Sequence, residues 1–258
     1  MTTYFPHEAA ASNESGGSAP GTGALSLSDA AGRNRIIAAL PSTAAESLLA
    51  EADLVDLALR DCLFEVGDTI THVHFPISAV TSVVTVMSDG SAVETATVGS
   101  EGMVGLTAVL GVPTANSRAF AQVPGLALRV PAATLSRLAR AHDGVDRVLS
   151  RYVLARLAQV SQTVACNRLH DVERRCARWL LMTHDRVATD EFPMTQDFLA
   201  QMLGVRRATV SLVASALQRR GLIGYRRGHM RILDRRGLEE ASCECYAIVR
   251  ERQARLLG

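Results

Sequence analysis

Hydrophobic positions in residues 195–223 repeat with helical spacing in two short blocks. In the first block Leu199 and Met202 share one side, and Thr195 stands where a helix cap is needed. Gly204 then interrupts the pattern, as expected for a left-handed residue that ends a helix. The second block runs from about residue 206 to 220 and carries apolar residues at i, i+3, i+4 and i+7: Val210, Val213, Ala214 and Leu217. This pattern predicts a helix, a tight turn and a second helix.

The segment Leu222–Leu233 follows and has the pattern of a strand, a turn and a second strand. Its turn residues are Arg226, Arg227 and Gly228, so the segment predicts a β-hairpin that carries arginines. Residues 195–236 hold nine Arg against two Asp, a net charge of +7, whereas the whole chain has +1. The positive charge is therefore concentrated on a helix-turn-helix with a hairpin wing, which is the geometry of a protein that binds a DNA groove.

The front part of the chain differs from this segment in composition and in hydrophobic pattern. Residues 1–30 are small, polar and glycine-rich, which predicts a disordered tail, and a short helical stretch is expected within 33–59. Residues 61–130 contain short segments rich in β-branched residues, with turn signals between them. We expect strands within 62–76, 79–87, 92–99 and 125–131. The fold class is therefore α+β, with a jelly-roll-like β-barrel sensor domain over residues 31–131.

A long helical tract begins after Pro131, and residues 132–168 are expected to form the connecting and dimerisation helices. A seam of residues spaced by three or four runs along it: Leu149, Val153, Leu157, Val160, Val164 and Asn167. Such a seam fits a helix that lies on its own domain, or a helix that pairs with a second copy of the chain. We favour dimerisation because the seam persists over about five turns. Residues 169–258 would then form the winged helix-turn-helix domain.

Charge and composition support two domains with separate roles. Residues 1–167 carry a net charge of −5 and residues 168–258 a net charge of +6. No apolar run approaches the ~20 residues needed to span a bilayer, and no export signal is apparent, so we expect a cytoplasmic protein without a membrane partner. The five cysteines are expected to be reduced.

The order of barrel, long helix and winged helix-turn-helix resembles the Crp/Fnr family of bacterial transcription regulators. The stretch TQDFLAQMLGVRRATVS, residues 195–211, strongly resembles the DNA-binding motif of that family, and the resemblance extends over about residues 60–235. It implies a homodimeric, sequence-specific regulator that reads a two-fold operator in double-stranded DNA, with RNA polymerase as a further partner. The implied DNA contacts are Thr195, Gln196, Arg206, Arg207, Thr209, Ser211, Arg226, Arg227 and Arg231.

The resemblance also assigns roles within this set. Arg207 and Ser211 would enter the major groove, and Thr209 would hold a phosphate. Many family members have Glu and Arg at the positions of Ala208 and Leu212. The operator is therefore not expected to match the one familiar in the family.

The effector cassette departs from the family pattern as well. Cyclic-nucleotide binders in the family have a Gly-Glu pair and then an Arg-Ser/Thr-Ala triplet that clamp sugar and phosphate. Here Met103 falls near the Glu position, and residues 115–117 read Ala-Asn-Ser. An anionic phosphate needs a positioned guanidinium or a nest of amides. We therefore expect an unidentified effector that is not a cyclic nucleotide held in the usual way, with Glu101 and Arg118 as candidate effector contacts.

Two alternative functions remain open. His72 and His74 lie two apart on a strand and would suit a metal-dependent barrel enzyme, but no carboxylate follows at a suitable spacing, so we expect no enzyme. The second alternative is a ligand-binding scaffold whose winged helix contacts protein, which the charge of +7 disfavours. No metal site or cofactor is predicted. No Cys precedes Cys62 to ligate an iron–sulfur centre, and Cys243 and Cys245 would point apart on a helix as reduced structural thiols.

Overall fold

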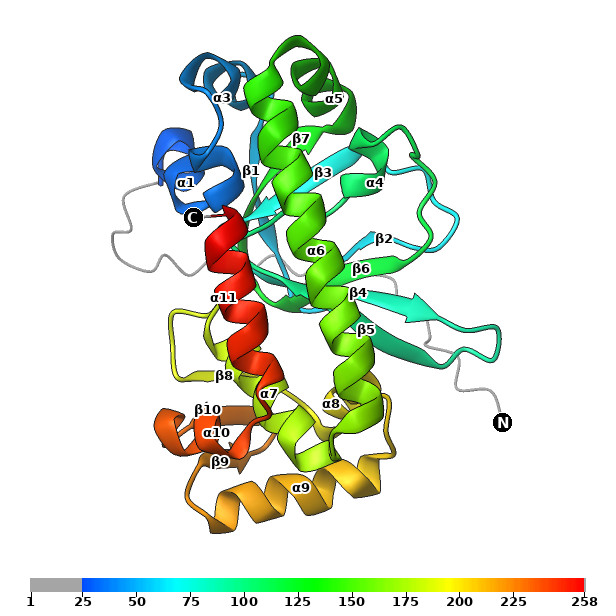
Figure 1. The fold of residues 1–258 in the computed structure, drawn as a ribbon, viewed down its shortest axis with the longest axis vertical. Helices are drawn as coiled ribbons and strands as arrows, with labels where there is room; N and C mark the ends of the chain where they lie inside the picture. The colour runs from blue at the N-terminus through cyan, green and yellow to red at the C-terminus, as the bar shows by residue number, and fades with distance from the viewer. Residues whose placement is uncertain (1–24, 258) are drawn as a thin grey trace, which may run out of the picture.

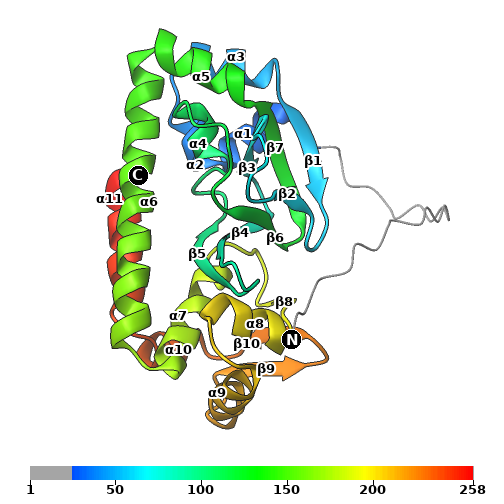
Figure 2. The same cartoon turned by 90° about the vertical axis from the view of Figure 1, so that its right-hand side faces the viewer.

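The computed structural model describes residues 25–257 and shows two halves joined by one long helix, α6 (Figure 1). One half carries two β-sheets and several short helices, and the other carries a small sheet and the helix-turn-helix (Figure 2). Within the described residues, no helix is long and apolar enough to cross a membrane.

The first described residues form three short helices, α1 (Leu27–Arg33), α2 (Arg35–Ala38) and α3 (Ser42–Leu49). Residues 1–24 of the expected tail lie outside the described part, and the expected boundary at residue 30 is wrong because α1 begins at Leu27. The helical stretch expected within 33–59 is also too long. Its last part, Asp53–Leu57, is strand β1, which pairs with β7 along its whole length.

The front half contains six more strands: β2 (Cys62–Phe64), β3 (His72–Pro76), β4 (Val80–Val86), β5 (Ala92–Val98), β6 (Arg118–Val123) and β7 (Gly125–Pro131). They form two antiparallel sheets, β1-β7-β3 and β2-β6-β4-β5. The predicted barrel is therefore not closed, because no ladder joins one sheet to the other. The short helix α4 (Leu106–Val109) lies between β5 and β6.

The expected helical tract consists of α5 (Ala132–Ala141) and α6 (Asp143–Leu169), with a break at His142. Helix α6 has 27 residues, so it is about 40 Å long. Its first half packs on the front half of the molecule, where Val145, Leu149 and Tyr152 join a core with α1–α3, α5, β3 and β7.

The rear half contains α7 (Val172–His184), β8 (Glu191–Pro193), α8 (Gln196–Leu203), α9 (Arg207–Arg219), β9 (Ile223–Arg226) and β10 (His229–Ile232). The predicted helix-turn-helix is confirmed. The Thr195 hydroxyl caps α8, and Gly204 has a φ of 63°, which a residue with a side chain rarely adopts. The predicted wing is also confirmed as β9 and β10, with Arg227 and Gly228 in the turn, and β8 extends the sheet in the order β8-β10-β9.

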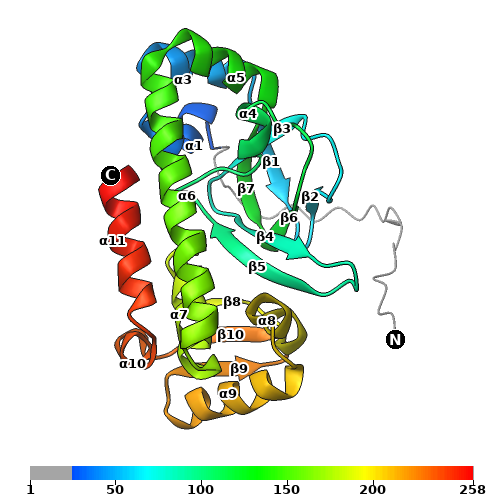
Figure 3. The ribbon, with the colours of Figure 1, turned by 45° about the vertical axis from the view of Figure 1, so that its right-hand side comes forward.

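Two helices follow the wing, α10 (Arg235–Ala241) and α11 (Cys245–Leu257). Helix α11 turns back and lies alongside α6 (Figure 3). The rear half also packs directly on the front half, since one buried cluster combines Val80 and Phe120 of the sheet with Trp179 of α7 and Leu199 of α8. The two halves therefore share a core.

Candidate functional site

The arginines of the helix-turn-helix and the wing are exposed at the end of the molecule farthest from α3 and α5 (Figures 1 and 2). Arg206 occupies the N-cap position of α9 and Arg207 its first turn, and both side chains face solvent. Arg226, Arg227 and Arg231 are exposed on the adjacent wing. These five arginines are therefore all open to solvent on neighbouring elements, and their role in DNA binding stays a prediction.

The opposite face of α9 holds the helix in place, because Val210, Ala214 and Leu217 are buried. Two of the expected DNA contacts also bond to each other: the Ser211 hydroxyl donates to Gln196 Oε1 at 2.6 Å. This bond joins the start of α8 to α9 across the turn.

Buried polar contacts join the basic half to the sheets. Trp179 Nε1 of α7 donates to the Glu94 carboxylate of β5 at 2.5 Å, and Ser82 and Thr97 donate to the same carboxylate at 2.7 and 2.9 Å. Burial raises the pKa of Glu94, although these donors favour its charged form. By accepting these hydrogen bonds, the Glu94 carboxylate links the sheet of the front half to α7 of the rear half.

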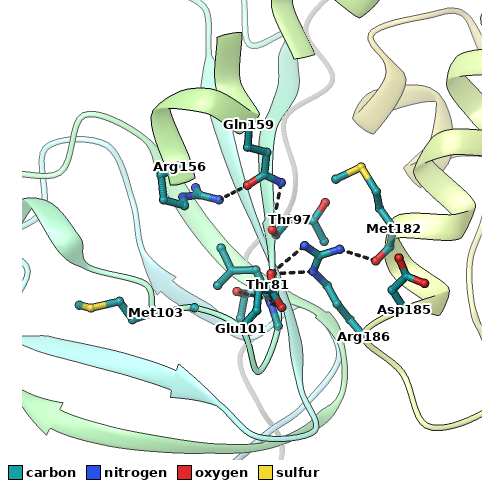
Figure 4. Close-up of polar contacts among 12 residues, drawn as sticks. Thr81, Thr97, Glu101, Met103, Arg156, Gln159, Met182, Asp185 and Arg186 are labelled. Carbon is teal, nitrogen blue, oxygen red and sulfur yellow. Dashed lines mark hydrogen bonds and ion pairs between the residues drawn. The ribbon is translucent and has the colours of Figure 1, made fainter. Parts of the chain in front are cut away.

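The candidate effector residue Glu101 takes part in the same contact (Figure 4). Arg186, which follows α7, donates from Nε and Nη2 to Glu101 Oε1 at 2.9 and 2.7 Å. The two side chains are 6% and 14% exposed. Gly99 permits this approach, because a Cβ on it would lie 2.7 Å from Cγ of Arg186. Glu101 is therefore held by Arg186 in a buried ion pair.

The backbone groups of Met103 in the cassette also have a hydrogen-bond partner within the protein. The Tyr152 hydroxyl of α6 donates to the Met103 carbonyl at 2.7 Å and accepts from the Met103 N–H at 3.0 Å. Burial raises the pKa of Tyr152, so the hydroxyl stays protonated. Arg118, the other candidate effector residue, pairs with Glu65 at 3.1 Å. The two candidate effector residues thus have separate protein partners.

His72 and His74 line a cavity of about 650 Å³ together with Arg129. Burial, together with the neighbouring His72 and Arg129, lowers the pKa of His74 to about 4. Within residues 25–257, neither histidine belongs to a group of three or more side chains that could hold a metal ion. A metal-dependent enzyme would therefore need ligands in addition to His72 and His74.

The dimer seam expected on α6 needs a correction. Leu149 is 3% exposed and belongs to the core of its own front half, so it is wrong as an interface residue. Leu157 and Val164 are 62% and 65% exposed, and Val153 and Val160 are half-buried. Leu154, which was not predicted, is 55% exposed. The exposed apolar stripe thus runs through Leu154, Leu157 and Val164.

The expectation that Cys243 and Cys245 point apart on a helix is also wrong. The chain is not helical between α10 and α11, and both thiols turn toward Cys166 and His170 at the end of α6. The spacing of Cys166 and His170, four residues apart where the predicted helical tract ends, is a signal in the sequence that could have indicated this cluster.

Two family models match the chain in the order of its two halves. The model of the cyclic nucleotide-binding domain matches residues 54–142, and that of the Crp-like helix-turn-helix domain matches residues 174–241. No curated protein matches the chain in sequence.

Several solved structures share the fold. FixK2 from Bradyrhizobium japonicum superimposes with a TM-score of 0.65 at 18% identity, covering 74% of this chain and 98% of that one. A putative Crp/Fnr regulator from Eubacterium rectale gives 0.63 at 16% identity, covering 78% and 94%. The c-di-GMP responsive regulator CLP from Xanthomonas campestris gives 0.60 at 17% identity, covering 74% and 99%. With both domain models matched in this order and the fold shared, the chain belongs to the Crp/Fnr family of transcription regulators.

Proposed function

We propose that the protein is a homodimeric regulator that binds a two-fold operator in double-stranded DNA through α9 and the wing. The observation that carries this proposal is the exposed arginine surface formed by Arg206 and Arg207 with Arg226, Arg227 and Arg231. In a helix-turn-helix, the N-terminal residues of the second helix approach base edges, and flanking basic residues hold phosphates. Thr195, Gln196, Thr209 and Ser211 would complete the contact surface. RNA polymerase is the further partner that a transcription regulator of this kind would engage.

The dimer would form through α6. Leu154, Leu157 and Val164 recur along it at intervals of three and seven residues, which is the spacing of a two-helix seam. They remain exposed although α11 already lies on α6, so α11 leaves this stripe free. Pairing of two α6 helices would cover the stripe and hold two α9 helices for one two-fold site.

We also propose that the sensor half does not bind a cyclic nucleotide in the usual way. Arg186 neutralises Glu101, and Tyr152 uses both backbone groups of Met103. No Arg stands in the triplet at residues 115–117. A nucleotide would therefore have to break contacts that join the two halves before it found a phosphate partner.

A regulator of transcription, and not an enzyme, is the function that these observations support. The alternative of a scaffold that contacts protein does not explain why the exposed arginines gather on the two elements that fit a DNA groove. The regulator would act on DNA in the cytoplasm.

The decisive experiment is footprinting across the genome of the native organism with the wild-type protein and with the Arg206→Ala/Arg207→Ala variant. Protected sites with two-fold symmetry, lost in the variant, are the expected result. Exposed arginines outside the surface, such as Arg236, provide the matched control, and Arg236→Ala should keep the footprint. Absence of any footprint, or a footprint that the double variant retains, would contradict the proposal.

A further inference from the structure

Four side chains that can ligate a metal converge where the rear half meets the end of α6. They are Cys166 on α6, His170 at its C-cap, Cys243 between α10 and α11, and Cys245 at the start of α11. One ligand atom of each lies within 4.8 Å of every other. The three thiols are buried and His170 is half-buried, so the group forms a closed cluster.

The distances fit one metal ion. Cys166 Sγ and Cys243 Sγ are 3.5 Å apart, and Cys245 Sγ lies 3.6 Å from His170 Nδ1. In a tetrahedral zinc site with Zn–S bonds of about 2.3 Å, neighbouring sulfurs are about 3.8 Å apart. A [4Fe–4S] cluster separates its cysteine sulfurs further, because each of these sulfurs binds a different iron. The spacing therefore favours a mononuclear ion.

The surroundings of the cluster are those of a metal centre. His170 Nε2 faces the Glu244 carboxylate at 3.2 Å, which orients the ring and leaves Nδ1 for a metal. Gln162 Nε2 donates to Cys245 Sγ at 3.1 Å, a bond that suits a thiolate. The side chain of Arg178 is buried and leaves its Nε without a hydrogen-bond partner. Such a cation would balance the negative charge of a site with three thiolates.

We propose that Cys166, His170, Cys243 and Cys245 bind one zinc ion in a tetrahedral Cys₃His site. This ligand set is one of those that hold structural zinc, and it leaves no position open for a substrate. The proposal is independent of the proposed DNA-binding function, since it rests on these four residues alone.

The location of the site indicates what the ion would do. His170 and Asp171 are the only residues between α6 and α7, so the site lies at the joint between the long helix and the DNA-binding half. Cys245 is the first residue of α11, which lies along α6, and Cys243 lies two residues before it. The ion would thus hold the start of α11 and the connection between α6 and α7 at the C-terminal end of α6. Loss of the ion should make both segments more mobile.

The first test measures metal directly. Full-length protein produced with zinc in the medium should contain one zinc per chain. After removal of the zinc, titration with cobalt(II) should give thiolate charge-transfer bands and the intense d–d bands of a tetrahedral ion. The Cys166→Ser and Cys243→Ser variants should lose both the zinc and the cobalt spectrum. Cys62→Ser removes the exposed thiol outside the cluster and should keep them.

Measurements on the wild-type protein test the proposal even if a variant does not fold. A zinc-free wild-type preparation that gives no tetrahedral cobalt spectrum would overturn the proposal. A Cys166–Cys243 disulfide with no bound metal, or an iron–sulfur spectrum, would also overturn it. As a second readout, zinc removal should speed proteolytic cleavage near residues 242–244, and added zinc should restore protection. Unchanged cleavage would contradict the fastening of α11. DNA binding is measured separately, so its presence or absence does not decide this test.

Discussion

Arg186 of the rear half and Glu101 of the front half form a buried ion pair, with Nη2 of Arg186 2.7 Å from Oε1 of Glu101. The pair connects the cassette, which follows β5, to Arg186, which lies just after the end of α7. A change at the cassette that moves Glu101 would therefore act directly on Arg186.

Removing one partner of this pair should be costly. Arg186→Met leaves the Glu101 carboxylate buried without its cation, so we expect a loss of about 3–5 kcal/mol in the free energy of unfolding. Urea denaturation measures this loss. Arg137→Met is the matched control, because Arg137 pairs with Glu51 at 2.7 Å with a side chain that is 60% exposed, and should lose less than about 1 kcal/mol. Equal losses in the two variants would show that the buried pair has no special role.

The apolar stripe on α6 predicts a dimer that substitution can dissociate. Leu157→Asp with Val164→Asp should give monomers, because dimerisation would bury two unpaired carboxylates. Both side chains are exposed in the single chain, so its fold should survive the change. Sedimentation velocity compares the variant with wild type, and Leu212→Asp, an exposed leucine on α9, is the control that should remain dimeric. An unchanged sedimentation coefficient for the double variant would remove the stripe from the interface.

Arg207 and Arg227 should differ in what they recognise. Arg207 lies at the end of α9 that approaches base edges, so Arg207→Ala should weaken binding to the operator by ~1–3 kcal/mol and affect random duplex less. Arg227 lies in the turn of the wing, so Arg227→Ala should weaken both duplexes alike and reduce the salt slope by about one.

These losses can be measured by titration with operator and scrambled DNA at several salt concentrations. If Arg207→Ala weakens both duplexes equally, Arg207 holds a phosphate. If neither variant loses affinity, α9 and the wing do not form the DNA-binding surface.

His74 predicts a dependence of stability on pH. Its pKa is lowered to about 4 in the fold, against an ordinary value of 6.5. Between these values the unfolded chain takes up a proton that the folded chain does not, so stability should fall as the pH falls from about 6.5 to about 4. The contribution of this one group is about 3 kcal/mol. His74→Gln removes it, and urea denaturation across this window should show a shallower pH slope for the variant. Identical slopes would assign the dependence to other groups.

The sequence predicted the elements whose structure depends on residues that are close together along the chain. The spacing of Val210, Ala214 and Leu217 set the buried face of α9, and Gly204 marked the turn before it. The wing followed from a turn at Arg227 and Gly228 between two strand patterns. Each of these features depends on neighbours within one or two turns of the chain.

Features that depend on distant partners were not readable in the same way. Leu149 has the same helical spacing as Leu157, but the short helices before β1 cover only the first half of α6, so the periodicity could not tell an internal face from an external one. Strand β1 was expected as helix because its partners on β7 lie 68 to 76 residues further along the chain. Glu101 and Arg186 are 85 residues apart, and no local pattern indicates their pairing.

The connection between α6 and α7 through only His170 and Asp171 has a geometric consequence for the proposed regulator. A two-residue connection leaves few backbone torsions, so a change in them would rotate the whole of α7 against the sheet residues on which it packs. Helix α7 has 13 residues and is about 20 Å long, so a rotation of about 10° moves its far end by about 3.5 Å. That displacement is close to the rise of one base pair, about 3.4 Å. A rotation this small is enough to shift a recognition helix out of register with its half-site.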